Sequence, residues 1–126
     1  MSDEGTCDVS IGEYDGDPAS VYHESIVTAR KAHTCDECGE PIAPKQQYER
    51  ISGKWDGAWS VWRLCLACRE IGGEFAEGGR VFGMLWEDFE YNWEDGAHLQ
   101  ACLNRLTTVA AKELMRRRWL KWKQLA

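Results

Sequence analysis

Two short stretches decide the fold of this chain, CDECG at residues 35–39 and CLAC at residues 65–68. Each contains a Cys-x-x-Cys pair, a spacing that lets two thiolates converge on one metal ion, and 26 residues separate the pairs. Two such pairs supply the four sulfur ligands that Zn²⁺ prefers in structural sites. The sequence therefore predicts a Zn²⁺ cofactor held by Cys35, Cys38, Cys65 and Cys68.

The same four cysteines are also compatible with other kinds of site. An iron–sulfur cluster or a rubredoxin-like iron would take the same ligands, and two disulfides are a further alternative. Four sulfurs close the coordination shell, so we expect a structural metal. His33 lies two residues before Cys35 and could join the site, but the simpler expectation is an exposed histidine at a strand end. His23 and His98 have no partner nearby in sequence and are expected to be non-catalytic.

The segment between the cysteine pairs indicates a treble clef. Gly39 suits a zinc knuckle, because the turn that points backbone amides at sulfur requires a residue that tolerates positive φ. Residues 47–52 and 58–64 are predicted as strands around an Asp-Gly turn, and residues 66–77 as a helix. A zinc ribbon, with the second pair on another hairpin, is the competing arrangement, because two glycines weaken the predicted helix.

Two more helices are predicted beyond this unit. From Phe82 to Trp93 the apolar residues recur at spacings of three, one, three and four, which indicates an amphipathic helix. A last helix is predicted at about residues 97–124, with Asp95 as its candidate cap. The fold class is therefore α+β, a small zinc-bound treble-clef-like β-hairpin/helix core followed by two α-helices, the last one long.

Charge divides the chain into segments. The net charge is −6, the first 24 residues carry seven acids and no lysine or arginine, and residues 104–126 carry seven bases and one acid. We predict an acidic mobile N-terminal segment at residues 1–18, a zinc-binding domain at 19–96 that opens with a weak strand, and a C-terminal amphipathic helix at 97–126 with a basic, tryptophan-containing end. The negative net charge argues against polyanion binding by the whole surface.

The expected location is the cytoplasm. No apolar run approaches the roughly 20 residues that a membrane span needs, and the acidic N-terminus has no apolar stretch typical of a secretory signal. In the cytoplasm thiols stay reduced, and paired cysteines favour metal over disulfide. Cys7 and Cys102 stand outside the two pairs, the first in the mobile segment and the second as a small packed hydrophobic residue.

Candidate partner-binding residues lie at the hairpin turn and at the C-terminal end. Trp55 either folds back onto the hairpin or anchors a partner, and Trp59 and Trp62 have opposite strand parity, so one of them should face outward. The basic end suits nucleic acid, an acidic protein groove or a membrane surface, or is a solvated helix end. The partner-binding set is therefore Trp55, Trp59, Arg116, Arg117, Arg118, Trp119 and Trp122.

The end of the last helix is predicted to present a second surface. The apolar stripe stops after Leu114, and Met115, Trp119 and Trp122 lie on a face turned by roughly 100°. The last three turns therefore cannot use the buried face of the first four, and we expect them to leave the domain.

No enzymatic activity is expected. His-Cys and His-Asn-His nucleases are built on a treble clef, but they need a histidine base beside a metal held by carboxylate or histidine. No histidine occurs between residues 34 and 97, where the hairpin and the following helix would carry it.

From residue 29 to about residue 86 the chain resembles a family of small, uncharacterised zinc-knuckle proteins of phages and prophages. The resemblance implies a phage-borne origin and the same four cysteine ligands, and it implies no activity. Similar sequences often have glycine at the position of Lys45. The shared features are Ala29-Arg30-Lys31, the two cysteine pairs with Gly39, Pro41-Ile42, Tyr48, the turn at residues 53–57 and Phe82-Gly83-x-x-Trp86.

We therefore expect a phage or prophage accessory protein that acts as a non-enzymatic binding module on a bacterial host protein, in host defence or transcription. Its place would be the cytoplasm of the bacterial host cell. The alternative is a nucleic-acid-binding regulator, with residues 116–123 on the phosphates and Trp119 or Trp122 stacking on bases.

Overall fold

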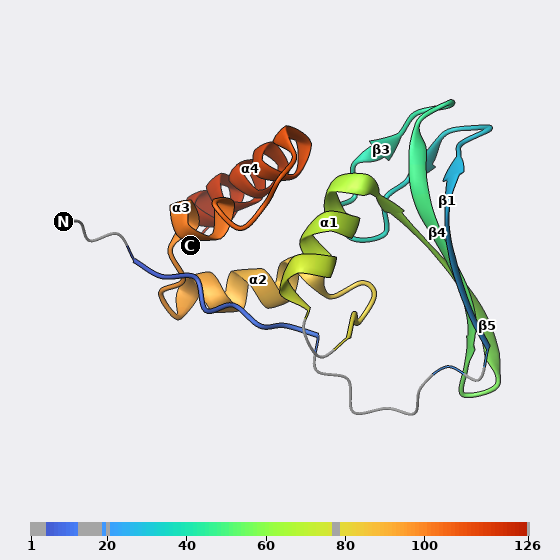
Figure 1. Ribbon diagram of the computed structural model, residues 1–126, viewed down its shortest axis with the longest axis horizontal. Helices are drawn as coiled ribbons and strands as arrows, with labels where there is room; N and C mark the ends of the chain where they lie inside the picture. The colour runs from blue at the N-terminus through green and yellow to red at the C-terminus, as the bar shows by residue number, and fades with distance from the viewer. Residues whose placement is uncertain (1–4, 13–18, 20, 77–78, 126) are drawn as a thin grey trace.

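The structure is a computed structural model that describes residues 5–12, 19, 21–76 and 79–125. It confirms the α+β class, with strands followed by helices along the chain (Figure 1). The described elements are β1 Val21–Thr28, β2 His33–Thr34, β3 Pro41–Ile42, β4 Gln47–Trp55, β5 Ala58–Cys65, α1 Leu66–Phe75, α2 Leu85–Glu94, α3 Leu99–Leu103 and α4 Val109–Leu125.

The strands form two antiparallel sheets. β1, β4 and β5 make a three-stranded sheet with β4 in the middle, and β2 and β3 make a small ribbon that flanks the first cysteine pair. β4 and β5 are the predicted hairpin. Their two-residue turn has positive φ at both Asp56 (52°) and Gly57 (82°), as a tight turn matched to the strand twist requires.

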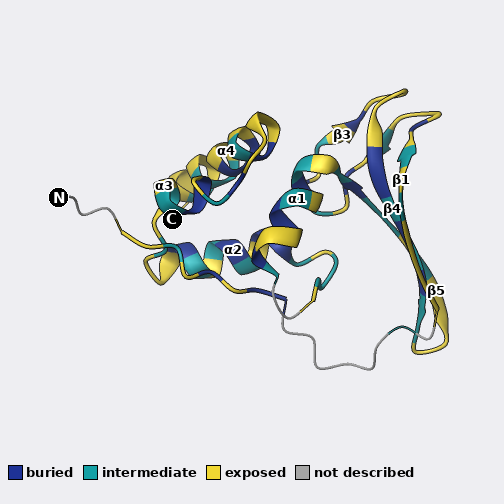
Figure 2. Ribbon diagram, viewed as in Figure 1, coloured by how far each residue is buried: buried dark blue, intermediate teal, exposed yellow. Residues whose placement is uncertain are grey.

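The helices all lie on one side of the three-stranded sheet, and α1 stands between the sheet and the other helices (Figure 1). Buried residues gather where α1, α2 and α4 meet (Figure 2). Phe75 of α1 and Phe89 of α2 are both fully buried, and their rings meet edge to face with centroids 4.8 Å apart. Such aromatic burial supplies much of the hydrophobic stabilisation of a small core.

The C-terminal helix is divided in two, which corrects the expectation of one long helix from residue 97. α3 ends at Leu103 and α4 begins at Val109. The N-cap of α3 is His98, whose Nδ1 accepts the backbone N–H of Ala101 at 3.4 Å, and not the expected Asp95.

The break before α4 is held by Glu70 of α1. Its carboxylate accepts the backbone N–H groups of Thr107 at 2.7 Å and Thr108 at 3.3 Å, and both threonine hydroxyls donate to it as well. The Thr108 hydroxyl in turn accepts the N–H of Ala111 at 3.2 Å. Burial alone would raise the pKa of Glu70, but the hydrogen bonds from Thr108 and Thr107 lower it overall.

Replacing Glu70 by alanine is expected to lower the free energy of unfolding by about 1–2 kcal/mol, because it leaves the N–H groups of Thr107 and Thr108, just before α4, without their carboxylate partner. Urea unfolding would measure the loss. Glu113→Ala is the matched control, since Glu113 is exposed on α4, and should change stability by less than about 0.5 kcal/mol. Equal effects of the two substitutions would contradict a stabilising role for the hydrogen bonds that Glu70 accepts before α4.

Part of the segment predicted as mobile is packed. Val9 and Ile11 are buried, and the N–H of Ile11 donates to the carbonyl of Phe75 at 3.0 Å. Cys102 of α3 is buried, as expected, but a disulfide joins it to Cys7, which was predicted to lie in a mobile segment. Residues 1–4 and 13–18 of the predicted segment lie outside the described residues.

Lys45 occupies a turn position that suits glycine. Its φ is +74°, in the left-handed region that side chains with a Cβ disfavour. We expect Lys45→Gly to raise the free energy of unfolding by about 0.5–1 kcal/mol, whereas Lys45→Ala, which keeps a Cβ, should leave it nearly unchanged. Chemical denaturation of both variants would test this, and equal stabilities of the two would disprove it.

Candidate metal centre

The four cysteines of the two pairs converge in space. Cys35 and Cys38 lie in the loop between β2 and β3, Cys65 ends β5, and Cys68 lies in the first turn of α1. Their Sγ atoms all lie within 4.8 Å of one another. Three are buried and Cys65 is partly buried. The structure therefore brings together the four predicted ligands in a cluster that can hold a metal ion.

The second pair lies at the start of a helix. α1 begins directly after Cys65, whose Sγ accepts the N–H of Cys68 at 3.5 Å and so caps the helix. This arrangement of knuckle, hairpin and helix is that of a treble clef, and a ribbon would place the second pair on another hairpin. α1 continues through both glycines near its end to Phe75, and Gly72 is buried against the side chain of Arg80.

Several N–H groups point at the sulfurs and favour their thiolate form. Trp86 of α2, which is 2% exposed, donates its indole N–H to Cys68 Sγ at 3.4 Å. Gly39 has φ of +78°, as the knuckle turn requires. Besides the N–H of Cys68, the backbone donors are Glu37 N–H to Cys35 Sγ at 3.4 Å, Glu40 N–H to Cys38 Sγ at 3.5 Å and Cys65 N–H to Cys35 Sγ at 3.4 Å.

The donor set fits a divalent cation. Hydrogen bonds from Cys38, Cys65 and Cys68 lower the pKa of Cys35, whereas hydrogen bonding with the other three sulfurs and burial raise the pKa of Cys68. One thiolate therefore opposes ionisation of the next unless a positive charge lies between them. A tetrahedron with metal–sulfur bonds of about 2.3 Å has edges of about 3.8 Å. The Sγ atoms of Cys38 and Cys65 are 3.9 Å apart.

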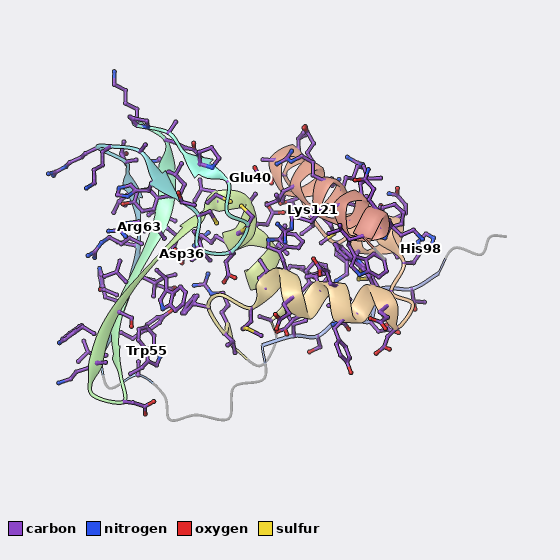
Figure 3. All side chains as sticks on the ribbon, turned by 180° about the vertical axis from the view of Figure 1, so that it is seen from behind. Asp36, Glu40, Trp55, Arg63, His98 and Lys121 are labelled. Atoms are coloured by element: carbon purple, nitrogen blue, oxygen red, sulfur yellow. A yellow bond between two sulfur atoms is a disulfide. The ribbon has the colours of Figure 1, made fainter. Side chains whose placement is uncertain are left out.

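Asp36 and Glu37, which lie between the first two cysteines, connect the cysteine cluster to the sheet and to α2. Asp36 exchanges two hydrogen bonds with the backbone of Arg63 on β5, each 2.8 Å long, and the two residues are labelled in Figure 3. The carboxylate of Glu37 accepts the N–H of Leu85 at the start of α2 at 3.1 Å, and burial raises its pKa. Sequence reasoning missed both roles, although two consecutive acids inside a knuckle are a usable signal.

α4 covers the other side of the knuckle. Arg117 forms a two-pronged ion pair with Glu40, with its closest contact at 3.0 Å, and Figure 3 shows Glu40 on the knuckle facing α4. Arg118 donates to the carbonyl of Cys38 at 3.4 Å and stacks over the ring of Trp86 at 5.4 Å. Two of the residues expected to bind a partner are thus engaged within the fold.

The last turns of α4 stay on the domain, contrary to expectation. Met115 is fully buried, and the ring of Trp122 lies 5.8 Å from that of Trp93. Trp119 is partly buried against the same core. Of the predicted basic set, Arg116 remains exposed on the helix surface. The structure therefore places most of the tryptophan-containing end against α2.

The three tryptophans of the β4–β5 hairpin do not all lie on the same side of the sheet. Trp55 packs between Tyr22 and Phe82, with ring centroids at 6.2 and 6.4 Å, so it folds back onto the hairpin. Trp62 faces the same side and stacks on Phe82 at 5.9 Å. Trp59 is 63% exposed on the opposite side, as the strand parity predicted for one tryptophan of this strand.

The histidines stand apart from the cluster. His33 lies beside the ring of Tyr48 at 5.4 Å, and His23 is exposed on β1. Among the described residues, no second group of three or more potential metal ligands is found.

In the described part of the chain, no helix has the length and apolar character needed to span a membrane. No family model, curated protein or solved structure matches the chain. Its function must therefore be inferred from the metal centre and the surfaces around it.

Proposed function

We propose that the cysteine cluster binds Zn²⁺ and that the protein is a zinc-stabilised binding module without enzymatic activity. The observation that carries this proposal is the closed, largely buried set of four sulfurs, which leaves no coordination position for a substrate. A bound Zn²⁺ would cross-link the knuckle to α1. Elemental analysis of purified protein should give one zinc per chain, and stoichiometric iron would contradict the assignment.

We also propose that the partner is a protein of a bacterial host, and that the chain is a phage or prophage accessory protein acting in host defence or transcription. Its proposed place is the host cytoplasm, although a disulfide such as that between Cys7 and Cys102 is rare there. The resemblance of residues 29–86 supports the origin. Trp59 and Val61, exposed by 63% and 38%, support the binding role, because exposed apolar side chains gathered on one face mark interaction sites. The nucleic-acid alternative at α4 has less support, since Arg117 and Arg118 are engaged within the fold.

Affinity capture from a bacterial lysate tests the host-protein proposal. Immobilised protein should retain a specific protein in equal amount with and without nuclease treatment, and Trp59→Ala should retain less. Retention of nucleic acid alone, or of proteins that disappear after nuclease, would reject the proposal. In that case a salt series of gel shifts should show steep weakening of binding, as phosphate contacts require.

A further inference from the structure

β5 has a free main-chain edge at its hairpin end. Near its other end, Arg63 exchanges hydrogen bonds with Asp36, and the N–H of Cys65 points at Cys35 Sγ, so both residues direct backbone groups away from β4. Along an antiparallel strand, the N–H and C=O groups of successive residues point alternately toward and away from the neighbouring strand. Those of Trp59 and Val61 therefore also point away from β4. Within the described part of the chain these groups have no hydrogen-bond partner.

The side chains on this part of β5 share one face of the sheet, the face away from α1. In the register, Trp59 lies opposite Lys54, Val61 opposite Ser52, and Arg63 opposite Arg50. We call this the outer face. The acids of the strands, Glu24 and Glu49, lie on the other face, where both bind Arg80. The outer face of the strands is thus free of acidic residues, although the chain as a whole is acidic.

The pair formed by Arg50 and Arg63 is costly to the sheet itself, because like charges directly opposite each other on a face repel. Among the described residues, no carboxylate forms an ion pair with either of them, and the enclosed Nε of Arg63 has no hydrogen-bond partner. Five of the other seven arginines have acidic partners, namely Arg69, Arg80, Arg105, Arg117 and Arg118, and Arg30 and Arg116 form no such pair among the described residues. Arg50 and Arg63 differ from these two because they face each other across the strands and one of them has an enclosed Nε without a partner, which indicates an anionic group supplied from outside.

We propose that an extended acidic segment of a partner protein adds to the sheet as a short strand along β5. Its main chain pairs with Trp59 and Val61, its apolar side chains cover theirs, and its carboxylates bind Arg50 and Arg63. Asp36 occupies the position beside Arg63, so the added strand ends there. This inference rests on the proposed function and specifies the partner's chemistry.

The free edge favours a polypeptide over nucleic acid. Only a polypeptide offers the alternating N–H and C=O groups that pair with a strand edge. The net charge of −6 also opposes a polyanion more than it opposes a short segment with a few carboxylates.

The test uses a displayed library of random short peptides selected on the intact, metal-loaded protein. Selected peptides should alternate acidic and apolar residues, and one synthetic representative should be measured by fluorescence anisotropy. Arg50→Glu and Trp59→Ala should each weaken its binding by about tenfold or more. Arg30→Glu is the matched control, a charge reversal at an exposed arginine between β1 and β2, and should leave binding unchanged.

Val61→Pro tests the main-chain contact. The N–H of Val61 points away from β4, so proline removes no ladder bond and an edge strand tolerates it. Binding should fall by about tenfold while zinc content stays the same. If this variant does not fold, the peptide is instead N-methylated on alternate residues. One methylation register should abolish binding and the other should spare it, and equal binding of both would overturn strand addition.

The outcomes separate this inference from the proposed function. If a host protein is captured less by Trp59→Ala but equally by wild type, Arg50→Glu and Val61→Pro, the inference is overturned and the proposed function stands. If no protein is captured, and a single-stranded oligonucleotide binds wild type but not Arg50→Glu, both are overturned. Selected peptides without acidic residues would also overturn the inference.

Discussion

Replacing Cys68 by serine is expected to abolish stoichiometric metal binding and to lower the free energy of unfolding by several kcal/mol, because metal binding and folding are coupled. Cys68 is fully buried and joins α1 to the knuckle, where the indole of Trp86 donates to its sulfur. Cys35→Ser should behave alike. Metal content by elemental analysis and stability by denaturant unfolding would measure both effects.

Metal removal from the wild type provides the control for this prediction. A strong chelator should lower wild-type stability to the level of Cys68→Ser, and added Zn²⁺ should restore the wild type but not the variant. A serine variant that is metal-free and as stable as the wild type would refute a structural centre.

Loss of the disulfide between Cys7 and Cys102 is expected to have the second largest effect. The bond joins residues 95 positions apart, so it restricts most of the unfolded chain, and Cys7→Ser should cost about 2–5 kcal/mol. It also holds the segment that carries Val9 and Ile11 against the helices. Denaturant unfolding at fixed zinc concentration would measure the loss.

The reductant TCEP distinguishes this bond from the metal centre. It should lower the stability of the wild type to that of Cys7→Ser and leave the variant unaffected. If wild type and Cys7→Ser are equally stable without reductant, the bond contributes nothing to the fold.

The metal centre was predictable because its signal is local. A Cys-x-x-Cys pair followed by glycine specifies a knuckle over a few residues, and the hairpin between the pairs is marked by its own Asp-Gly turn. Helix α1 was predictable for the same reason, although its glycines left the ribbon open. Given these local elements, the four-sulfur site follows if the fold brings the two cysteine pairs together, and it does.

The divided C-terminal helix was not predictable, because its cause is distant in sequence. Glu70 holds Thr107, 37 residues later, through a hydrogen bond that no periodicity reveals. The same holds for the packing of α4, where Glu40 and the carbonyl of Cys38 attract arginines that in sequence form a solvated basic run.

The packing of the N-terminal segment was not predictable from its composition. Its acids indicate a solvated chain, but two apolar residues, Val9 and Ile11, suffice to pack residues 5–12 once Cys7 is bonded to Cys102. A disulfide between one cysteine in a polar segment and another on a helix cannot be read from spacing.

The contact between Trp86 and Cys68 also makes the centre observable by light. The indole lies in the core with its N–H on the sulfur, so its emission depends on whether that sulfur is a thiol or a metal-bound thiolate. Cobalt bound by the cluster would absorb near-ultraviolet light through sulfur-to-metal charge transfer, in the range of indole emission, and should quench this indole. The protein therefore carries an intrinsic optical reporter of metal occupancy, placed at the centre itself.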